Sequence, residues 1–355
     1  MNLKSLKNLD KSNMFDVLRT FPEQIKHALD IGQSINFANS ISNSDNILIL
    51  GMGGSAIGGD LLRSYLSELG DANHIDIKIN RDYTFSPHLA KNSLVIASSY
   101  SGNTEETLSG VRLALEHTKN IVCITTGGEL EKIAKENNLN IIKVPEGFQP
   151  RCAIGYSFFP LLYLVLKSGS LSEGVVNRIE SEISSTLNRL NQLSNEYSIE
   201  NINDNFALSI AEKLKNKMPI IYTSRAMESV GLRWRGQFQE NAKRAAFGSV
   251  LPEMNHNEIN SWQYREDFNK DFFFFLLEDR LDHAQVSKRF DYLEKVLLQE
   301  NRQVKRLKSV ADSHLERMFK AIYLGDWVSF WLAIITEKDP TAIDIILGLK
   351  AELSK

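Results

Sequence analysis

Residues 46–60 read Asn-Ile-Leu-Ile-Leu-Gly-Met-Gly-Gly-Ser-Ala-Ile-Gly-Gly-Asp, and this stretch decides the fold. An apolar run over residues 46–50 ends in glycines and one serine, and the residues that follow have helical spacing. The pattern predicts a strand, a tight turn and a helix. Glycines let the backbone turn sharply and approach a ligand, and the N-terminus of a helix favours an anion. We therefore expect a phosphate site at Gly53, Gly54 and Ser55.

This stretch differs from two other glycine motifs that bind phosphates. A P-loop ends in Lys followed by Ser or Thr, whereas Gly59 and Asp60 stand at that position here. A dinucleotide-binding turn requires G-x-G-x-x-G and an acidic residue about 20 residues later. Here the third glycine is off that spacing, and Asp76 lies inside the next apolar run. A tight turn that binds no ligand is the alternative for this stretch taken alone.

Strands and helices alternate through the first half of the chain. Further apolar runs, each followed by a turn or a helical pattern, cover residues 75–79, 93–97, 121–124 and 141–145. Strands that are nearly all apolar and alternate with helices indicate a parallel sheet covered on both faces. The predicted fold class is therefore α/β, a doubly wound parallel sheet in three α/β/α layers. Ligands bind such sheets at the carboxyl ends of the strands.

A second turn at a strand end is rich in hydroxyl groups. The run 93–97 leads into Ser99, Ser101 and Thr104, which surround Gly102 and precede a helical pattern. Several hydroxyls at a helix start can donate to the oxygens of a phosphate while remaining uncharged. The alternative for Ser101 and Thr104 is N-capping, which is compatible with phosphate binding because both use donors at a helix start. Two such loops in one sheet predict a phosphomonoester site.

The segment from Ser99 to Thr104 reads Ser-Tyr-Ser-Gly-Asn-Thr. It resembles the sugar isomerase (SIS) domain, whose hallmark is a Ser-x-Ser-Gly-x-Thr loop. The resemblance implies that the phosphate belongs to a sugar.

The second half repeats the alternation of strands and helices. Residues 219–224 read as a strand that ends in hydroxyls, and the runs 272–276 and 303–307 continue the pattern. We therefore expect two SIS-type domains, residues 1–168 with a helical lead-in and residues 169–355 with connecting and C-terminal helices. Residues 282–320 hold no motif that we can match.

Composition restricts the possible partners and the compartment. The formal net charge of −3 gives no general attraction to nucleic acid or to an anionic membrane. Cys123 and Cys152 lie in or beside apolar runs and form no CxxC pair, which favours buried thiols in a reducing compartment. The first ten residues lack the apolar segment of a signal peptide, and the apolar stretch 158–166 is too short to span a bilayer. We expect a cytoplasmic protein.

Three segments carry residues suited to a reaction. Arg151 follows a proline in an apolar neighbourhood, an odd place for a merely solvated charge. Glu240 lies in the segment 234–243, and His256 lies between two asparagines in a loop just before a helix. The other six histidines lie in charged or helical surface contexts, and we interpret them as structural or solvated.

These segments occur in an order that resembles the bifunctional phosphoglucose/phosphomannose isomerase family over nearly the whole chain. The resemblance implies that Glu240 is the base, that Arg151 lies beside the reacting carbons and that His256 opens the sugar ring. It also implies a homodimer, in which His256 is contributed across the interface. Lys350 is the candidate for a C-terminal catalytic lysine, with an ordinary lysine at the end of a helix as the alternative. Thr341 is a loose match to a residue that shapes specificity.

The predicted function is an aldose–ketose isomerase of hexose 6-phosphates. It would interconvert glucose 6-phosphate and mannose 6-phosphate with fructose 6-phosphate through an enediol. We expect no cofactor and no metal, because no cluster of histidines and carboxylates has zinc-like spacing. The alternatives are a non-catalytic SIS protein that binds sugar phosphates, and an amino-sugar phosphate isomerase.

Overall fold

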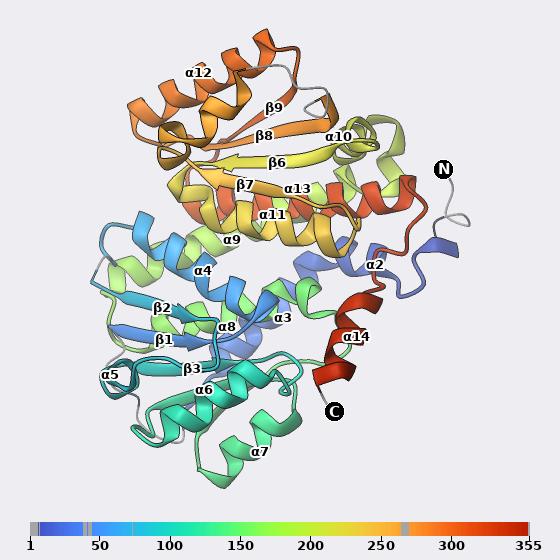
Figure 1. The fold of residues 1–355 in the computed structure, drawn as a ribbon. Helices are drawn as coiled ribbons and strands as arrows, with labels where there is room; N and C mark the ends of the chain where they lie inside the picture. The colour runs from blue at the N-terminus through green and yellow to red at the C-terminus, as the bar shows by residue number, and fades with distance from the viewer. Residues whose placement is uncertain are drawn as a thin grey trace. The chain divides into compact units, whose positions relative to one another are not determined.

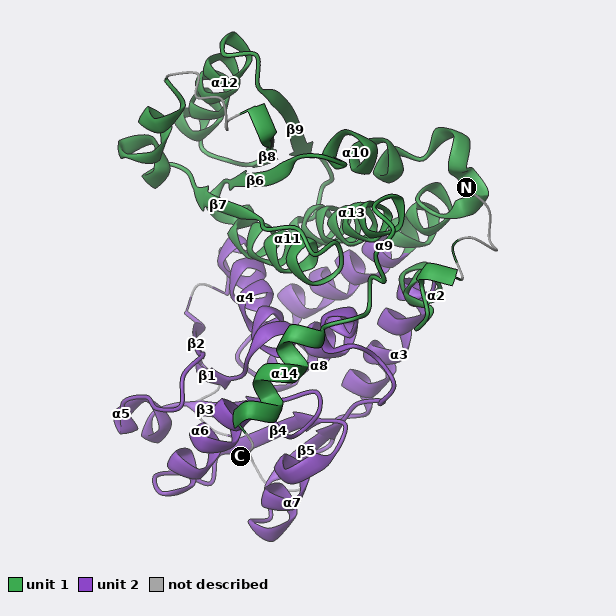
Figure 2. Ribbon diagram, turned by 45° about the vertical axis from the view of Figure 1, so that its right-hand side comes forward, with its two compact units in different colours: residues 1–19, 188–355 green, residues 20–187 purple. Residues whose placement is uncertain are grey.

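The computed structural model describes residues 6, 8–37, 41, 45–72, 74–263 and 270–353. Contacts divide the chain into two compact units, which Figure 2 colours separately. Unit 1 comprises Met1–Arg19 and Asn188–Lys355, and unit 2 comprises Thr20–Leu187. This division falls inside α9 (Glu173–Glu196), later than the predicted boundary after residue 168. The domain boundary after residue 168 stays a prediction.

Unit 2 contains one parallel sheet of five strands in the order β2-β1-β3-β4-β5. All the strands predicted in the first half of the chain are present. Their bounds are β1 (Asn46–Leu50), β2 (Asp76–Asn80), β3 (Leu94–Ser98), β4 (Ile121–Thr125) and β5 (Asn140–Lys143). Nearly every residue of β1, β3 and β4 is buried, as expected for central strands covered on both faces.

Helices cover both faces of this sheet (Figure 1). One layer contains α3 (Phe21–Ser34), α4 (Gly53–Glu68) and α8 (Ile154–Lys167), and the other contains α5 (Pro87–Lys91), α6 (Glu105–Leu115) and α7 (Gly128–Glu136). Alternation along β1 separates the two layers. Ile49 packs against Gly59 of α4, whereas Leu50 packs against Gly110 of α6. The three-layer α/β/α prediction is confirmed for this unit.

Unit 1 contains a parallel sheet of four strands in the order β7-β6-β8-β9. Their bounds are β6 (Met218–Thr223), β7 (Phe247–Val250), β8 (Phe272–Asp279) and β9 (Gln303–Ser309). The sequence predicted β6, β8 and β9 but not β7. This strand is four residues long, contains Gly248 and lies at the edge of the sheet, so it lacks the apolar run of a central strand.

The helices of unit 1 also lie on two faces of its sheet (Figure 1). On one face Trp234 of α11 (Glu228–Glu240) packs edge-on against Phe275, with ring centroids 5.1 Å apart. Helix α13 (His314–Ile335) packs against α11, and α10 (Phe206–Leu214) packs against α13. On the other face Phe290 and Leu293 of α12 (Ala284–Gln299) pack on the core. Helix α12 and strand β9 thus occupy the stretch 282–320, for which the sequence offered no motif.

Helix α13 is the one described helix that is long and apolar enough, by length and composition, to cross a membrane. In the structure 83% of its apolar window is buried inside the protein. It also anchors the start of the chain, because Phe15 of α2 (Met14–Arg19) packs edge-on against Trp327, with centroids 5.6 Å apart. It is therefore a buried helix in the core of unit 1.

The remaining elements are short or lie outside the two sheets. They are α14 (Asp344–Leu353), η1 (Pro150–Cys152), η2 (Ile199–Asp204), η3 (Arg225–Met227), η4 (Glu253–His256) and η5 (Glu258–Trp262). In both sheets the first strand in the chain pairs with the second on one side and with the third on the other. The prediction that the two halves share one architecture is confirmed.

Candidate functional site

The strand order indicates a candidate ligand site in unit 2 between β1 and β3. In an open α/β sheet ligands bind outside the carboxyl ends of the strands, at the point where the strand order reverses. Here β1 lies between β2 and β3, so this point lies beyond the ends of β1 and β3. The glycine turn follows β1 and the hydroxyl-rich loop follows β3. The two loops are in contact, because the N–H of Tyr100 donates to Ser55 Oγ at 3.3 Å.

Gly54 brings the segment of Arg151 against the start of α4. A Cβ atom at Gly54 would lie 2.6 Å from the carbonyl oxygen of Pro150, so only glycine fits between the two backbones. Gly53, the first residue of α4, has a φ of +48°. Arg151 lies in η1 and is 4% exposed. The structure therefore brings three predicted residues, Gly53, Gly54 and Arg151, to one place in unit 2.

The predicted hydroxyls lie in the loop after β3. Ser99 Oγ and Thr104 Oγ1 are 2.9 Å apart and share a hydrogen bond, and Ser99 is buried. Ser101 is exposed, and its hydroxyl accepts from the N–H of Asn103 at 3.2 Å. Thr104 occupies the N-cap position of α6, yet its hydroxyl does not cap the helix. Among the described residues no side chain caps α4 or α6, so the start of each helix can serve an anion.

The loop after β4 supports this hydroxyl-rich loop. The N–H of Thr126 donates to the carbonyl of Tyr100 at 3.0 Å. Gly102, with a φ of +70°, lies so close to Gly127 that a Cβ atom would be 1.8 Å from the carbonyl oxygen of Gly127. The hydroxyl of Tyr100 donates to the carbonyl of Pro145 at 2.7 Å. These contacts fix the donors of the loop before any ligand arrives, which lowers the entropy cost of binding.

Glu240 is the last residue of α11 in unit 1 and is partly exposed. A buried polar seam holds this helix against α13. We use "seam" for five buried side chains. Three lie four residues apart on α11 and at its C-cap, and two lie three residues apart on α13: Arg233, Gln237, Asn241, Asp326 and Ser329.

Hydrogen bonds join the members of the seam, and the carboxylate of Asp326 accepts two of them. Asp326 accepts from Arg233 Nη2 at 2.8 Å and from Gln237 Nε2 at 2.8 Å. Asn241, the neighbour of Glu240, donates to Ser329 Oγ at 3.0 Å. Burial raises the pKa of Asp326, whereas Arg233 and Gln237 favour its charged form and oppose the rise. The seam thus fixes the end of the helix that carries Glu240.

The other predicted residues of unit 1 lie on short elements. His256 ends η4 and is exposed, and Lys350 lies in the last turn of α14, where residues 344–353 are all exposed. Thr341 is buried, and its N–H donates to Asp339 Oδ1 at 2.8 Å. Beside His256, Glu258 accepts from the hydroxyl of Tyr222 at 2.6 Å, which ties the loop to β6.

Sequence reasoning missed two polar groups of unit 1. The first is the seam, which the recurrence of polar residues at positions 233, 237 and 241 could have indicated. The second lies at the end of β8, where Arg317 Nε donates to Asp279 at 2.7 Å and His314 lies 3.4 Å from the same oxygen. Burial raises the pKa of Asp279, but the contacts with His314 and Arg317 outweigh it and lower the pKa to about 2. Burial raises the pKa of nearby Asp282 to about 6.

Within the described ranges, no three His, Cys, Asp or Glu side chains are grouped so that they could hold a metal ion. The two cysteines are free and buried, and burial raises the pKa of Cys123 to about 12. The donors of unit 2 are hydroxyls, backbone N–H groups and one guanidinium. Such a set suits a phosphate ester.

Comparisons with known proteins identify relatives of this chain. Residues 40–165 match the SIS domain, and residues 203–353 match the C-terminal SIS domain of bacterial phospho-glucose isomerase. The chain is 39% identical to a bifunctional phosphoglucose/phosphomannose isomerase of Caldicellulosiruptor bescii, over 96% of this chain and 99% of the relative. It is 33% identical to the enzyme of the same name from Aquifex aeolicus, over 90% and 94% of the two chains.

A solved structure, that of a hypothetical protein from Thermus thermophilus, has the same fold. The two structures align with a TM-score of 0.71 and 13% sequence identity, over 96% of this chain and 90% of the other.

Proposed function

The chain belongs to the bifunctional phosphoglucose/phosphomannose isomerase family, and from this we infer that it is an aldose–ketose isomerase of hexose 6-phosphates. It interconverts glucose 6-phosphate and mannose 6-phosphate with fructose 6-phosphate, an intramolecular oxidation and reduction. The observation that carries the inference is the contact between the glycine turn and the hydroxyl-rich loop at the reversal point of the sheet in unit 2. We further propose that the protein is cytoplasmic.

We propose that the phosphate is bound by the two loops after β1 and β3. The starts of α4 and α6 supply backbone donors, and Ser55, Ser99, Ser101 and Thr104 supply hydroxyls. Neutral donors hold a dianion without the desolvation cost of burying several cations. The sugar chain then extends toward Arg151, whose segment packs on Gly54.

In the proposed mechanism, Glu240 removes a proton from C2 of the aldose and returns it to C1. A positioned general base accelerates such a reaction by about 10²–10⁴-fold. The enediolate oxygens carry negative charge while the proton is transferred. Arg151, which is always protonated, stabilises this charge, so the step needs no metal. Because the planar enediol has lost its stereochemistry at C2, rotation about C2–C3 lets one base serve both aldose epimers.

We propose that His256 opens the sugar ring and that a second subunit contributes it. Ring opening requires a proton at the ring oxygen and removal of a proton from O1, and histidine is suited to such transfers near neutral pH. Lys350 assists in this step. The exposure of His256 and Lys350 in the single chain supports this proposal, because both side chains are accessible to a second subunit.

The first test is a coupled assay with fructose 6-phosphate in the presence of a chelator. We expect formation of both aldose phosphates, and we expect the Glu240→Gln variant to lose turnover while it still binds fructose 6-phosphate. The matched control is Glu212→Gln, which changes an exposed glutamate of α10. Binding without turnover in the wild type would identify a sugar-phosphate sensor, and turnover only with ammonia or glutamine would identify an amino-sugar enzyme.

A mixing experiment tests the placement of His256. Glu240→Gln and His256→Ala chains are each expected to be inactive. If the histidine acts across the interface, an equal mixture forms heterodimers with one intact site and regains about a quarter of the wild-type activity. A mixture that stays inactive, while mixing of the chains is verified, would place His256 and Glu240 of the same chain in one site.

A further inference from the structure

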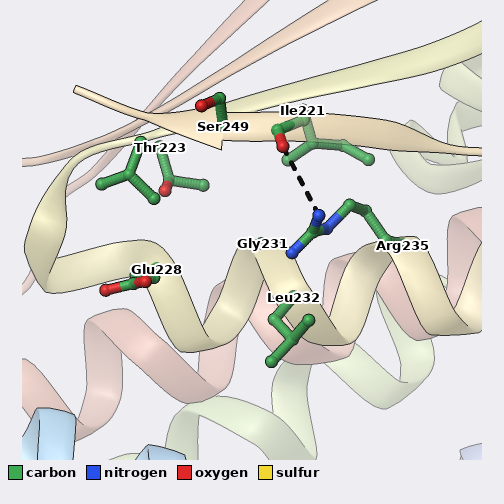
Figure 3. Close-up of a pocket in the computed structure, with 9 residues that line it drawn as sticks. Ile221, Thr223, Glu228, Gly231, Leu232, Arg235 and Ser249 are labelled. Carbon is green, nitrogen blue, oxygen red and sulfur yellow. Dashed lines mark hydrogen bonds between the residues drawn. The ribbon is translucent and has the colours of Figure 1, made fainter. Parts of the chain in front are cut away.

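A second candidate binding site lies within unit 1, between α11 and the strands β6 and β7. The cavity has a volume of about 70 Å³ and is open on one side. This exceeds the share of one water in the liquid, about 30 Å³. Figure 3 shows its lining, which comprises Ile221, Thr223, Glu228, Gly231, Leu232, Arg235, Gly248, Ser249 and Val250. None of these residues belongs to the site proposed above.

The only cation that lines this cavity is Arg235, and it is poorly paired. Its side chain reaches from α11 toward β7 (Figure 3). Nη1 donates to the carbonyl of Gly248 at the long distance of 3.4 Å, and no carboxylate of the described residues forms an ion pair with it. Burial lowers the pKa of Arg235, an effect that Glu228 opposes. A guanidinium has five donors in a planar fork, so most of its hydrogen-bonding capacity is unused.

Thr223 provides a second, independent indication. It is 2% exposed, and its Oγ1 atom has no hydrogen-bond partner within the described part of the chain. Its side chain lies on the wall of the cavity, with Cγ2 packed toward Gly231. A buried hydroxyl without a partner costs free energy, and an acceptor that reached it from the cavity would remove this cost.

The charges around the cavity favour an anion. Glu228 is the one carboxylate on the lining, and it is paired with Arg225 Nη1 at 2.9 Å. The two charges of that pair cancel, which leaves the positive charge of Arg235. Gly231 and Gly248 lie tightly packed on the lining, because a Cβ atom would be 2.4 Å from Thr223 Cγ2 at Gly231 and 1.9 Å from the carbonyl oxygen of Ile221 at Gly248.

We propose that this cavity binds a phosphate group, with the fork of Arg235 and the hydroxyl of Thr223 as donors. Arginine recognises phosphate oxygens through two parallel hydrogen bonds. The group is either free inorganic phosphate or the phosphoryl end of an ester whose organic part extends through the opening. The proposal does not depend on the isomerase activity, since it concerns binding alone.

Calorimetric titration with inorganic phosphate tests the proposal in a background where the first site is disabled. The background is the full-length Ser101→Ala/Thr104→Val variant, which we expect to keep one phosphate site per chain. Arg235→Gln in this background should weaken phosphate binding by about 10-fold or more, because a charge-assisted hydrogen bond is lost. Thr223→Val, which keeps the shape of the side chain, should weaken it by a few-fold. Circular dichroism verifies that each variant is folded.

Titration with fructose 6-phosphate in the same background distinguishes the two sources of the group. Binding of both ligands, each weakened by Arg235→Gln, would indicate a site for esters, whereas binding of inorganic phosphate alone would indicate free phosphate. Equal phosphate affinity with and without Arg235→Gln would overturn the proposal. So would the loss of all phosphate binding in the Ser101→Ala/Thr104→Val background, or a dimer in which a partner side chain fills the cavity. None of these results would affect the Glu240→Gln test of the isomerase.

Discussion

The buried pair of Arg233 and Asp326 offers the sharpest test of how α11 is held. The Asp326→Asn substitution keeps the size of the side chain and removes its charge. Arg233 Nη2 lies 2.8 Å from Asp326 Oδ2, and the two side chains are 3% and 4% exposed. At that distance and an effective dielectric constant of ~20, the Coulomb attraction is about 6 kcal/mol. Desolvation offsets part of it, and removal of one partner from a buried pair typically costs about 3–5 kcal/mol.

Tryptophan fluorescence during urea unfolding measures this cost in unit 1. The four tryptophans are Trp234, Trp262, Trp327 and Trp331, all within residues 188–355. The signal therefore reports the unfolding of unit 1, even if the two units unfold in separate transitions. We expect the free energy of unfolding of this unit to fall by about 3–5 kcal/mol in the Asp326→Asn variant.

Two controls separate the buried charge from other effects. Glu196→Gln removes one partner of an exposed pair, in which Arg189 Nη1 lies 2.9 Å from Glu196 Oε1, and should cost less than about 1 kcal/mol. The double variant Arg233→Met/Asp326→Leu removes both charges and should recover most of the loss, since apolar replacement of a buried pair is often neutral.

The seam also bears on the proposed catalysis, because α11 ends at Glu240. In the Asp326→Asn variant we expect kcat to fall more than KM rises, since the proposed phosphate loops belong to unit 2. A loss below about 1 kcal/mol, equal to that of Glu196→Gln, would refute the reasoning, because the pair would then contribute no more than an exposed one.

Three further predictions follow from single positions. Gly54→Ala places a Cβ atom 2.6 Å from the carbonyl oxygen of Pro150, so it should destabilise unit 2 by about 1–3 kcal/mol and weaken fructose 6-phosphate binding; unchanged binding and stability would contradict the close approach. The pKa of Asp282 is raised from 3.8 to about 6 by burial, so its contribution to stability is present below 3.8 and is lost as pH rises through 6. As pH rises from 3.8 to 6, the free energy of unfolding of Asp282→Asn should therefore increase relative to that of the wild type by about 1 kcal/mol, after solvent screening. If the unfolding free energies of the two proteins changed in parallel with pH, the pKa of Asp282 would not be shifted. Tyr222→Phe leaves the indole N–H of Trp262, which donates to the tyrosine hydroxyl at 2.8 Å, without that acceptor; urea unfolding should show a loss of about 1–3 kcal/mol, and a neutral result would mean that water replaces the hydroxyl.

The loops of unit 2 could be predicted from the sequence because their chemistry is local. Gly53, Gly54 and Ser55 follow an apolar run directly, and the segment from Ser99 to Thr104 is a continuous motif. Parallel strands place their carboxyl ends along one edge, so two loops after two strands must lie near each other. The contact between the N–H of Tyr100 and Ser55 Oγ agrees with this expectation.

Residues that act through tertiary contacts were not predictable in the same way. Asp326 lies in an apolar helix that reads as core, and its partners on α11 are about 90 positions earlier in the chain. Strand β7 was missed because a short edge strand needs no apolar run on both faces. The cavity beside Arg235 depends on which helix face meets which strands, and helical spacing alone does not specify this.

The sequence by itself determined the alternation of strands and helices, the positions of the two proposed phosphate loops and the family to which the chain belongs. These depend on residues close together in the chain, whose backbone preferences and apolar periodicity act locally. Only the tertiary structure decided the strand order that makes the end of β1 a candidate ligand site, the packing of the Arg151 segment against Gly54 and the seam that fixes the end of α11. Burial is the physical reason, since a charge such as that of Asp326 is stable inside a protein only where distant residues supply its hydrogen bonds.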